Sequence, residues 1–196
     1  MSTLPGPRTG RFDAVVVGAS AGGVAALRQL LHALPADLPM PVVAVLHLPR
    51  DRPSQLAELL GHGCALPVAE AEDKARLLPG TVWIAPPDYH LLVEDRTTLA
   101  LSLDEPVMFS RPAIDPLFES AASVFGERLL ALLLTGASSD GSEGVAAVRA
   151  AGGEAWIQSP EDAVSSTMPA SALARAGADR VLTLDQICER LRGSQQ

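Results

Sequence analysis

The sequence predicts an α/β fold: a doubly wound, mostly parallel sheet with helices on both faces and an antiparallel hairpin in the middle of the chain. Short β-branched or leucine-rich runs alternate with helical patterns along most of its 196 residues, and that alternation is typical of βαβ units. Aromatic residues make up only 4% of the chain, so the core must consist mainly of leucine, valine and alanine. We expect a flexible leader over residues 1–12 and a single folded domain over 13–196.

The first part of the chain supplies two strand–helix units. A valine run predicts a strand at 14–17, and the glycine-rich turn after it leads into a helical pattern at 23–33. The run "VVAVL" predicts a strand at 42–46, and a helix is expected at 54–61.

The middle of the chain departs from this alternation. The stretch "TVWIAPPDYHLLVEDRTTLALSL" contains a strand that ends at Pro86 and two short strands around the turn Glu94-Asp95-Arg96, which predicts the hairpin. A proline-rich linker follows, and the alternation then resumes. The remaining helices are expected at 115–124, 142–151, 169–176 and 185–192, and the remaining strands at 128–134, 154–158 and 180–183.

The composition excludes several classes of function. The formal net charge is -8, so the chain lacks the basic footprint that nucleic acid or anionic lipid requires. Cys64 and Cys188 lie far apart without metal-ligand spacing, which favours buried thiols in a reducing compartment. The sequence contains no apolar run of about 18 residues and no secretory signal. We therefore expect a soluble cytoplasmic protein with no metal, no cofactor and no membrane insertion.

The glycine-rich turn "GASAGG" at 18–23 allows three interpretations. A Walker loop needs a lysine after the last glycine, and the sequence has Val24 there. A dinucleotide fingerprint needs a glycine where Ser20 stands and an acidic residue at the end of the second strand, where the sequence has His47. The third interpretation is a nucleophile elbow, because residues 18–22 read G-x-S-x-G between a strand and a helix.

A nucleophile elbow makes structural demands on this turn. The serine backbone is expected to be strained, and its neighbours must be small so that the helix can approach the strand closely. The N–H groups that follow Ser20 would point from a helix N-terminus toward a developing oxyanion. The alternative is that Ser20 only caps the following helix, since serine is a favoured N-cap.

A catalytic serine needs a base, and histidine is the usual one. His32 lies late in the first helix, and His62 lies in a loop at the opposite edge of the sheet. His47 ends the second strand, beside Ser20 in the expected topology, whereas His90 also follows a strand and is its rival. The coincidence with the serine at one edge favours His47.

Asp140 is the candidate third member of a triad. It follows a buried strand in "LLALLLTGASSDGSEG" and can accept a hydrogen bond from His47 at this edge. Its other interpretation is an N-cap of the next helix, with Glu143 three residues later completing a capping box. The two roles do not exclude each other. The chain order Ser, His, Asp differs from that of the α/β-hydrolases.

Several motifs together resemble the catalytic domain of the chemotaxis protein-glutamate methylesterases, the CheB family. The resemblance runs from about Phe12 to Leu191. The motifs that carry it are "VVVGASAGGVAAL", "PVVAVLHLP", "PVAEAEDKARLLPGTVWIAPPDYHLLV", "SRPAIDPLFESAA", "LLLTGASSDGSEGVAAVRAAGG" and "SSTMPASAL". Residues 13–196 are thereby identified as similar to a methylesterase catalytic domain.

The resemblance implies a serine hydrolase that demethylates glutamyl methyl esters on chemoreceptors and that, in some members, also deamidates receptor glutamines. The family's serine, histidine and aspartate map to Ser20, His47 and Asp140. The implied partners are a methylated chemoreceptor or a similar signalling protein. A separate receiver or regulatory chain is a further implied partner, because only about a dozen residues precede the first strand. The backbone N–H groups expected to line the site and receive the oxyanion are those of Ala21, Gly22, Gly23 and Ala137.

Two positions depart from the family pattern, and three alternatives stay open. Ala21 stands where receptor-directed members often have threonine, and Ala137 stands where they often have methionine, so the substrate is the open question. The alternatives are a serine esterase acting on a different ester, a non-catalytic module that binds a signalling partner, and a nucleotide-binding domain.

Overall fold

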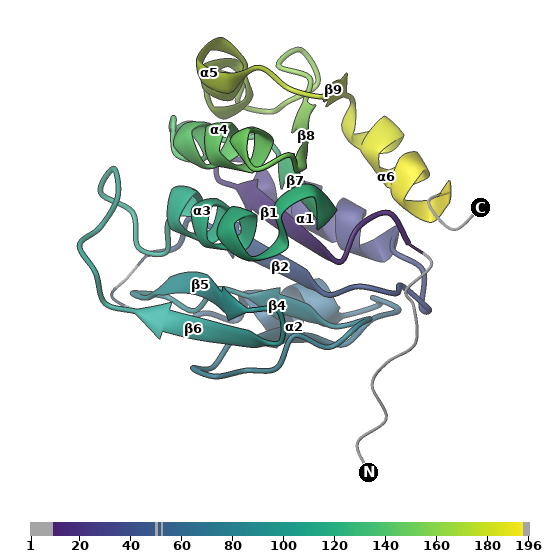
Figure 1. Ribbon diagram of the computed structural model, residues 1–196, viewed down its shortest axis with the longest axis vertical. Helices are drawn as coiled ribbons and strands as arrows, with labels where there is room; N and C mark the ends of the chain where they lie inside the picture. Colours follow the sequence, from purple (N-terminus) through teal and green to yellow (C-terminus); the bar gives the residue numbers. More distant parts are fainter. Residues whose placement is uncertain (1–9, 50, 52, 194–196) are drawn as a thin grey trace.

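A central sheet determines where the chemically active residues lie. The computed structural model describes residues 10–49, 51 and 53–193. Seven parallel strands form the sheet in the order β3-β4-β2-β1-β7-β8-β9 (Figure 1). The strands are β1 (Ala14–Ala19), β2 (Val42–Leu46), β3 (Val68–Glu70), β4 (Val82–Ile84), β7 (Leu129–Leu133), β8 (Glu154–Gln158) and β9 (Arg180–Leu182).

The direction in which successive strands are added to the sheet reverses at β1. From β1 the chain proceeds to β2, β3 and β4 on one side, and it then returns to β7, β8 and β9 on the other side. Every residue of β1, β2 and β7 is buried, which is why these strands read as continuous apolar runs rather than alternating ones. In such sheets ligands bind beyond the carboxyl ends of the strands at the point of reversal. The predicted doubly wound sheet is confirmed.

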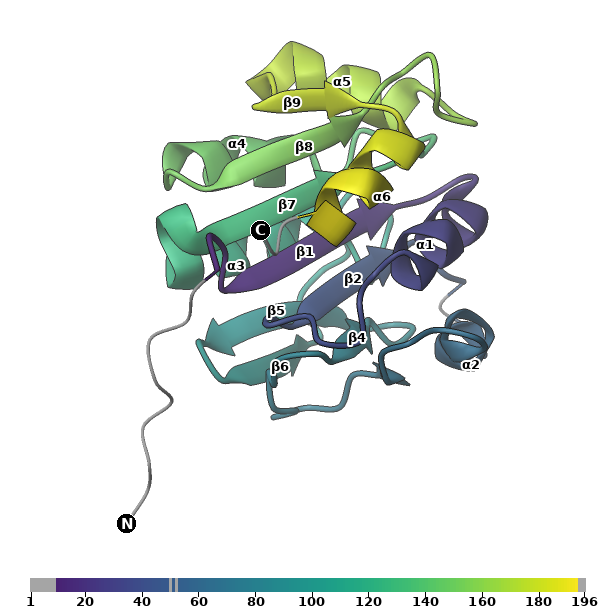
Figure 2. The same ribbon diagram turned by 90° about the vertical axis from the view of Figure 1, so that its right-hand side faces the viewer.

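Helices cover both faces of the sheet, as Figure 2 shows. One face carries α1 (Gly23–His32), α2 (Leu56–Gly61) and α6 (Leu184–Gly193), and the other carries α3 (Ile114–Phe125), α4 (Ser142–Ala150) and α5 (Thr167–Ala176). A 3₁₀ turn, Gly126–Arg128, leads from α3 into β7. Successive side chains of a strand point to opposite faces, so Val15 and Val17 belong to the first core and Ala14 and Val16 to the second.

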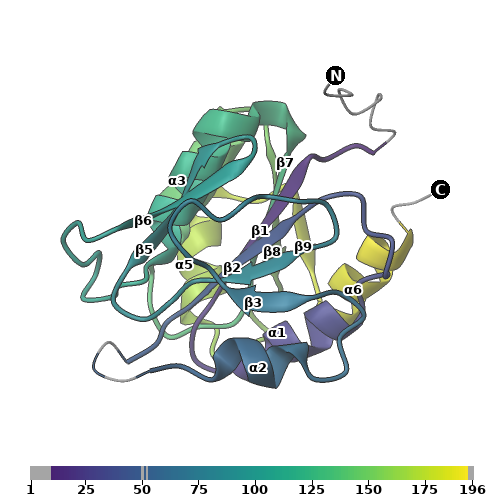
Figure 3. The ribbon, with the colours of Figure 1, turned by 90° about the horizontal axis from the view of Figure 1, so that it is seen from below.

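The hairpin predicted in the middle of the chain is present. β5 (His90–Asp95) and β6 (Thr98–Ser102) form a separate antiparallel pair, and they lie beside α3 rather than in the main sheet (Figure 3). Leu91, Val93 and Leu99 of the hairpin are buried in the same core as α3. The segment between β6 and α3 projects from the molecule beside the hairpin (Figure 3).

Two features differ from the sequence expectations. The short edge strand β3 has no predicted counterpart, because two of its three residues are exposed and give no apolar run. Of the expected leader, residues 1–9 lie outside the described part, whereas Phe12 is buried in the core; the packed part of the domain therefore begins before Asp13. Among the described residues, no helix has the length and apolar character needed to cross a membrane.

Candidate active site

The turn between β1 and α1 presents Ser20 at the carboxyl edge of the sheet. The Ser20 amide donates to the carbonyl of Thr135 (2.9 Å), which joins this turn to the segment after β7. A Cβ at Gly18 would lie 2.5 Å from Ile114 Cγ2, and one at Gly23 would lie 2.4 Å from Leu46 Cδ1. The expectation of small residues around Ser20 is therefore correct at Gly18 and Gly23. A larger side chain at Gly18 would push away α3, and one at Gly23 would push away β2.

The backbone strain expected at the serine is absent. Ser20 is not among the described residues with positive φ, and the left-handed conformation falls instead on Gly22, the N-cap of α1, with φ 79°. The Ser20 side chain does not cap α1 either, because its hydroxyl lies against an imidazole. Glycine takes up the sharp bend at no steric cost, so the serine keeps an ordinary conformation and its hydroxyl stays available.

His47 follows β2, the neighbour of β1, and its imidazole lies between two other side chains. Its Nδ1 lies 3.0 Å from Ser20 Oγ, and its Nε2 lies 2.7 Å from Asp140 Oδ2. The register that pairs Ala19 with Leu46 brings the serine and the histidine together, because each is the next residue after a strand end. The histidine side chain is 14% exposed, so a small part of the ring is accessible from solvent.

The two contacts distinguish the two nitrogens of the imidazole. Asp140 can only accept when ionised, so Nε2 carries the proton that it donates to the carboxylate. Nδ1 then has a lone pair facing the Ser20 hydroxyl. The imidazole is thus oriented to take the serine proton on Nδ1, and the carboxylate can stabilise the positive charge that follows.

Asp140 lies in the segment after β7 and is fully buried. Oδ2 accepts from the Ile114 amide at 2.6 Å in addition to His47, and Oδ1 accepts from the Asp115 amide at 2.9 Å. The expected capping box at its own helix is wrong: α4 has Gly141 as N-cap with no side-chain bond, and Glu143 pairs with Arg175. Asp140 caps α3 instead, where two orphan amide groups and the positive end of the helix dipole hold its negative charge.

Asp115, a second buried carboxylate beside Asp140, gave no signal in the sequence. It lies in the first turn of α3, and its Oδ1 accepts from the amides of Gly141 (2.9 Å) and Gly144 (2.7 Å). Burial raises the pKa of the Asp115 carboxyl to about 7; the Gly144 bond opposes the rise and the charge of Asp140 adds to it. The expected helix at 115–124 begins at this residue, but a helical pattern does not indicate that the Asp115 carboxylate binds amides of another helix.

The other three histidines lie away from the Ser20 hydroxyl and make different contacts. The Nε2 atom of His90 is 3.0 Å from the Glu105 carbonyl, and the Ala113 amide donates to its Nδ1, so this buried ring connects the segment before α3 to β5. His32 is exposed, and its Nε2 atom lies 3.1 Å from the carbonyl of His62, the C-cap of α2. None of these contacts involves Ser20.

The residues expected to supply oxyanion donors lie in two segments. Ala21, Gly22 and Ala137 are exposed at the turn after β1 and in the segment after β7. The Gly23 amide donates to the Ser20 carbonyl at 2.7 Å, so this N–H group belongs to the turn itself. In the part of the chain that the structure describes, no group of three or more histidine, cysteine, aspartate or glutamate side chains is arranged to hold a metal ion.

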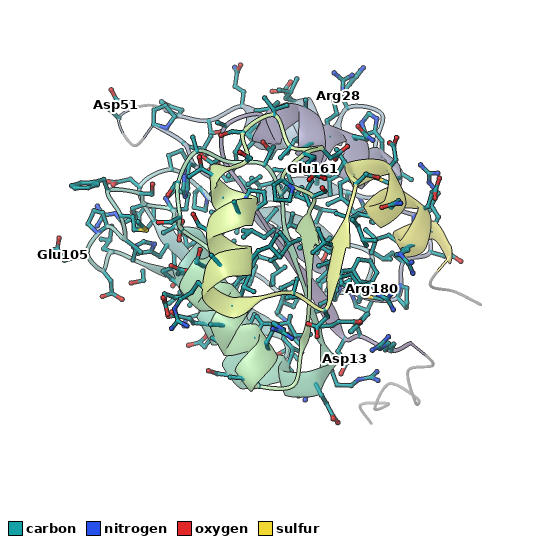
Figure 4. The ribbon with its side chains drawn as sticks, turned by 90° about the horizontal axis from the view of Figure 1, so that it is seen from above. Asp13, Arg28, Asp51, Glu105, Glu161 and Arg180 are labelled. Carbon is teal, nitrogen blue, oxygen red and sulfur yellow. The ribbon has the colours of Figure 1, made fainter. Side chains whose placement is uncertain are left out.

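The three side chains meet at the edge predicted for ligands. In Figure 4, Asp51 and Glu161, which follow β2 and β8, lie on the upper side of the molecule, and Asp13, which precedes β1, lies on the lower side. Ser20, His47 and Asp140 follow β1, β2 and β7 and so belong to the upper side. A hydroxyl, an imidazole and a buried carboxylate joined in this order define the class of site that serine hydrolases use.

Comparisons with known proteins place the chain in a family. It matches the model of the CheB methylesterase family over residues 15–191, and it belongs to that family. The solved catalytic domain of the Thermotoga maritima CheB methylesterase is 34% identical, with a TM-score of 0.87 over 93% of this chain and 98% of that one.

Curated relatives carry the name protein-glutamate methylesterase/protein-glutamine glutaminase. One from Leptospira interrogans is 40% identical over 178 residues, which cover 91% of this chain and 92% of the relative. One from Anaeromyxobacter dehalogenans is 42% identical over 183 residues, which cover 92% of this chain and 52% of the relative. The chain thus spans nearly the whole of the first relative and about half the length of the second.

Proposed function

We propose that this chain is a serine hydrolase that demethylates glutamyl methyl esters on chemoreceptor-type signalling proteins. The observation that carries the proposal is the hydrogen-bonded series Ser20, His47 and Asp140 in a chain of the CheB methylesterase family. The names of the relatives, which join methylesterase and glutaminase, support a second reaction at the same site, the deamidation of receptor glutamines.

Acylation begins with the serine. His47 Nδ1 takes the hydroxyl proton as Ser20 Oγ attacks the ester carbonyl carbon, and Asp140 stabilises the imidazolium. The carbonyl oxygen becomes an oxyanion, which the N–H groups of Ala21, Gly22 and Ala137 would receive. When the intermediate collapses, the bond to the methoxy oxygen breaks, and that oxygen leaves as methanol with the proton from His47.

Deacylation repeats the steps with water. His47 takes a proton from a water molecule, which attacks the glutamyl-serine carbonyl, and the imidazolium then returns that proton to Ser20 Oγ. The products are a glutamate side chain and the free enzyme. With a glutamine substrate the first leaving group is ammonia instead of methanol, and the acyl-enzyme is the same.

The test is methanol release from chemoreceptor membranes methylated in vitro. We expect release by the wild type, none above background by Ser20→Ala, and a loss of about 10²–10⁴ in kcat for His47→Ala, the usual contribution of a general base. Ser139→Ala is the matched control: its hydroxyl contacts Met108 Sδ rather than the triad, and it should retain activity. Equal release by wild type and Ser20→Ala would contradict the mechanism.

The departures from the family pattern at Ala21 and Ala137 keep a second substrate class open. Both residues are exposed, Ala21 directly after the serine and Ala137 in the segment that carries Asp140, where they would contact the groups next to the scissile bond. A serine esterase for another ester would hydrolyse small esters in a Ser20-dependent way and release no methanol from receptor membranes. A non-catalytic module would do neither.

A further inference from the structure

Two buried carboxylates behind His47 cap each other's helices. Asp140, just before α4, binds the amides of Ile114 and Asp115 at the start of α3. Asp115, inside the first turn of α3, binds the amides of Gly141 and Gly144 at the start of α4. Through these four hydrogen bonds, each helix N-terminus is capped by a carboxylate from the other segment. A movement of either carboxylate would therefore disturb the helix that it caps.

Asp115 is connected to the reacting atoms through Asp140. The two carboxylates are 7% and 0% exposed, so little water screens the interaction between their charges. Asp140 in turn holds His47 at 2.7 Å. The charge on Asp115 therefore acts on the imidazolium in a medium where electrostatic interactions are strong, although Asp115 itself has no contact with the ring.

The surroundings of Asp115 contain both charges and open space. Glu119 lies one turn further along α3 and is exposed, Glu143 projects from α4, and Arg175 of α5 pairs with Glu143. A cavity of about 310 Å³ is lined by Asp115, Ser142 and Arg175, among others. The buried Ser142 hydroxyl has no hydrogen-bond partner within the described protein. Asp115 thus faces a polar cavity in which proton exchange is feasible.

We propose that Asp115 is a positioning residue of the triad: it holds the Asp140 segment through two amides, and its ionisation strengthens the hold of Asp140 on protonated His47. The inference rests on the proposed serine hydrolase mechanism, but it requires no particular ester. Acylation creates a positive imidazolium, so an additional negative charge behind Asp140 lowers the barrier to that step.

The charge on Asp115 changes near neutral pH. With its pKa raised to about 7, the carboxyl is mostly neutral at pH 6 and mostly ionised at pH 8. The reactivity of Ser20 should therefore keep rising between these values. A residue that only capped a helix would leave the pH dependence of the reaction unchanged.

The experiment measures covalent labelling of Ser20 by diisopropyl fluorophosphate between pH 5.5 and 9, followed by mass spectrometry. Ser20 Oγ bonds to phosphorus, fluoride leaves, and the hydroxyl proton passes to His47, so no receptor is needed. Asp115→Asn keeps an oxygen that can accept from both amides but cannot ionise. We expect it to react about tenfold more slowly than wild type at pH 8, equivalent to about one pK unit of lost interaction, and nearly equally at pH 6.

Two further variants separate charge from structure. Glu119→Gln removes a carboxylate from the same helix without touching either amide pair, and its rate should stay within about twofold of wild type because exposed charges are screened. Asp115→Ala removes the cap as well and should lower both the rate and the melting temperature. In the wild type, the Gly141 and Gly144 amide NMR shifts should titrate with a midpoint near pH 7, because burial raises the pKa of Asp115 to about 7.

Each outcome is decisive. Superimposable pH profiles for wild type and Asp115→Asn would overturn the proposal, and so would an equal effect of Glu119→Gln. If Asp115→Asn does not fold, the wild-type amides decide: the absence of their transition refutes the ionisation on which the proposal depends. Ser20 labelling with no methanol release from receptors would reject the proposed substrate and leave the Asp115 result valid. No labelling of Ser20 would reject both.

Discussion

Removal of the Asp140 carboxylate should lower both the free energy of unfolding and the rate of catalysis. The carboxylate caps α3 and also binds the imidazole of His47. In Asp140→Ala the amides of Ile114 and Asp115 lose their acceptor. Both residues are buried, at 0% and 7% exposure, so water cannot replace the carboxylate without rearrangement. An unsatisfied buried polar group costs about 1–3 kcal/mol. The two amides together therefore predict a loss of about 2–6 kcal/mol in the free energy of unfolding.

Asp140→Asn separates the two roles. Its single amide oxygen can accept from only one of the two α3 amides, which bind separate oxygens of Asp140, so about half of the stability loss expected for Asp140→Ala should appear. The amide nitrogen, or the loss of charge, weakens the bond from His47 Nε2 and favours the tautomer that protonates Nδ1, which cannot accept the Ser20 proton. A loss of about 10⁴ in kcat is the effect known for the corresponding change in another serine hydrolase.

The assay pairs urea unfolding with ester hydrolysis for Asp140→Ala, Asp140→Asn and Ser20→Ala. Ser20→Ala is the control, since it removes the nucleophile and leaves the α3 cap intact; it should be inactive with wild-type stability. Wild-type stability of Asp140→Ala would refute the capping argument. Full activity of Asp140→Asn would refute the assignment of Nδ1 as the base.

Two further predictions concern packing and pH. Gly18→Ala should lower stability by about 1–3 kcal/mol through overpacking, because its Cβ would lie 2.5 Å from Ile114 Cγ2. Thermal unfolding tests this, with Gly193→Ala as the matched control because a Cβ there would have nothing within 4 Å. Equal melting temperatures of the two variants would contradict the reasoning. The raised pKa of Asp115, about 7, means that the folded state binds this proton more tightly than the unfolded chain, whose carboxyl titrates near pH ~4. Its stabilising contribution is complete below pH ~4 and is lost as the pH rises to about 7. The melting temperature of wild type relative to Asp115→Asn should therefore fall over this range, and a constant difference would show that the carboxyl is not perturbed.

The sequence predicted most of the fold because the strands of this sheet are buried on both faces. β1, β2 and β7 are uninterrupted apolar runs, and the glycine turn after β1 marks the change to helical periodicity. The hairpin was also readable from its two short strands. β3 was not, since an edge strand of three mostly exposed residues carries neither an apolar run nor a clear alternation.

The capping of α4 shows why local patterns fail at the site. Asp140 and Glu143 have the spacing of a capping box, yet the Asp140 carboxylate binds amides 25 and 26 residues earlier in the chain. A capping motif considers only hydrogen-bond donors within a few residues of the aspartate. In the packed protein, two amides of α3 and a protonated nitrogen of His47 compete with those local donors for the Asp140 carboxylate. The long-range partners win because they supply three donors to one buried carboxylate.

The order of the elements, and the positions of a serine, a histidine and an aspartate after β1, β2 and β7, could be predicted from the sequence. Each of these facts depends on periodicity and on neighbours within a few residues. The ring orientation of His47, the helix that Asp140 caps and the burial of Asp115 beside it could be seen only in the packed fold. These depend on how closely α3 and α4 pack at the sheet edge, because desolvation and hydrogen bonding between distant segments exist only once both segments are in place.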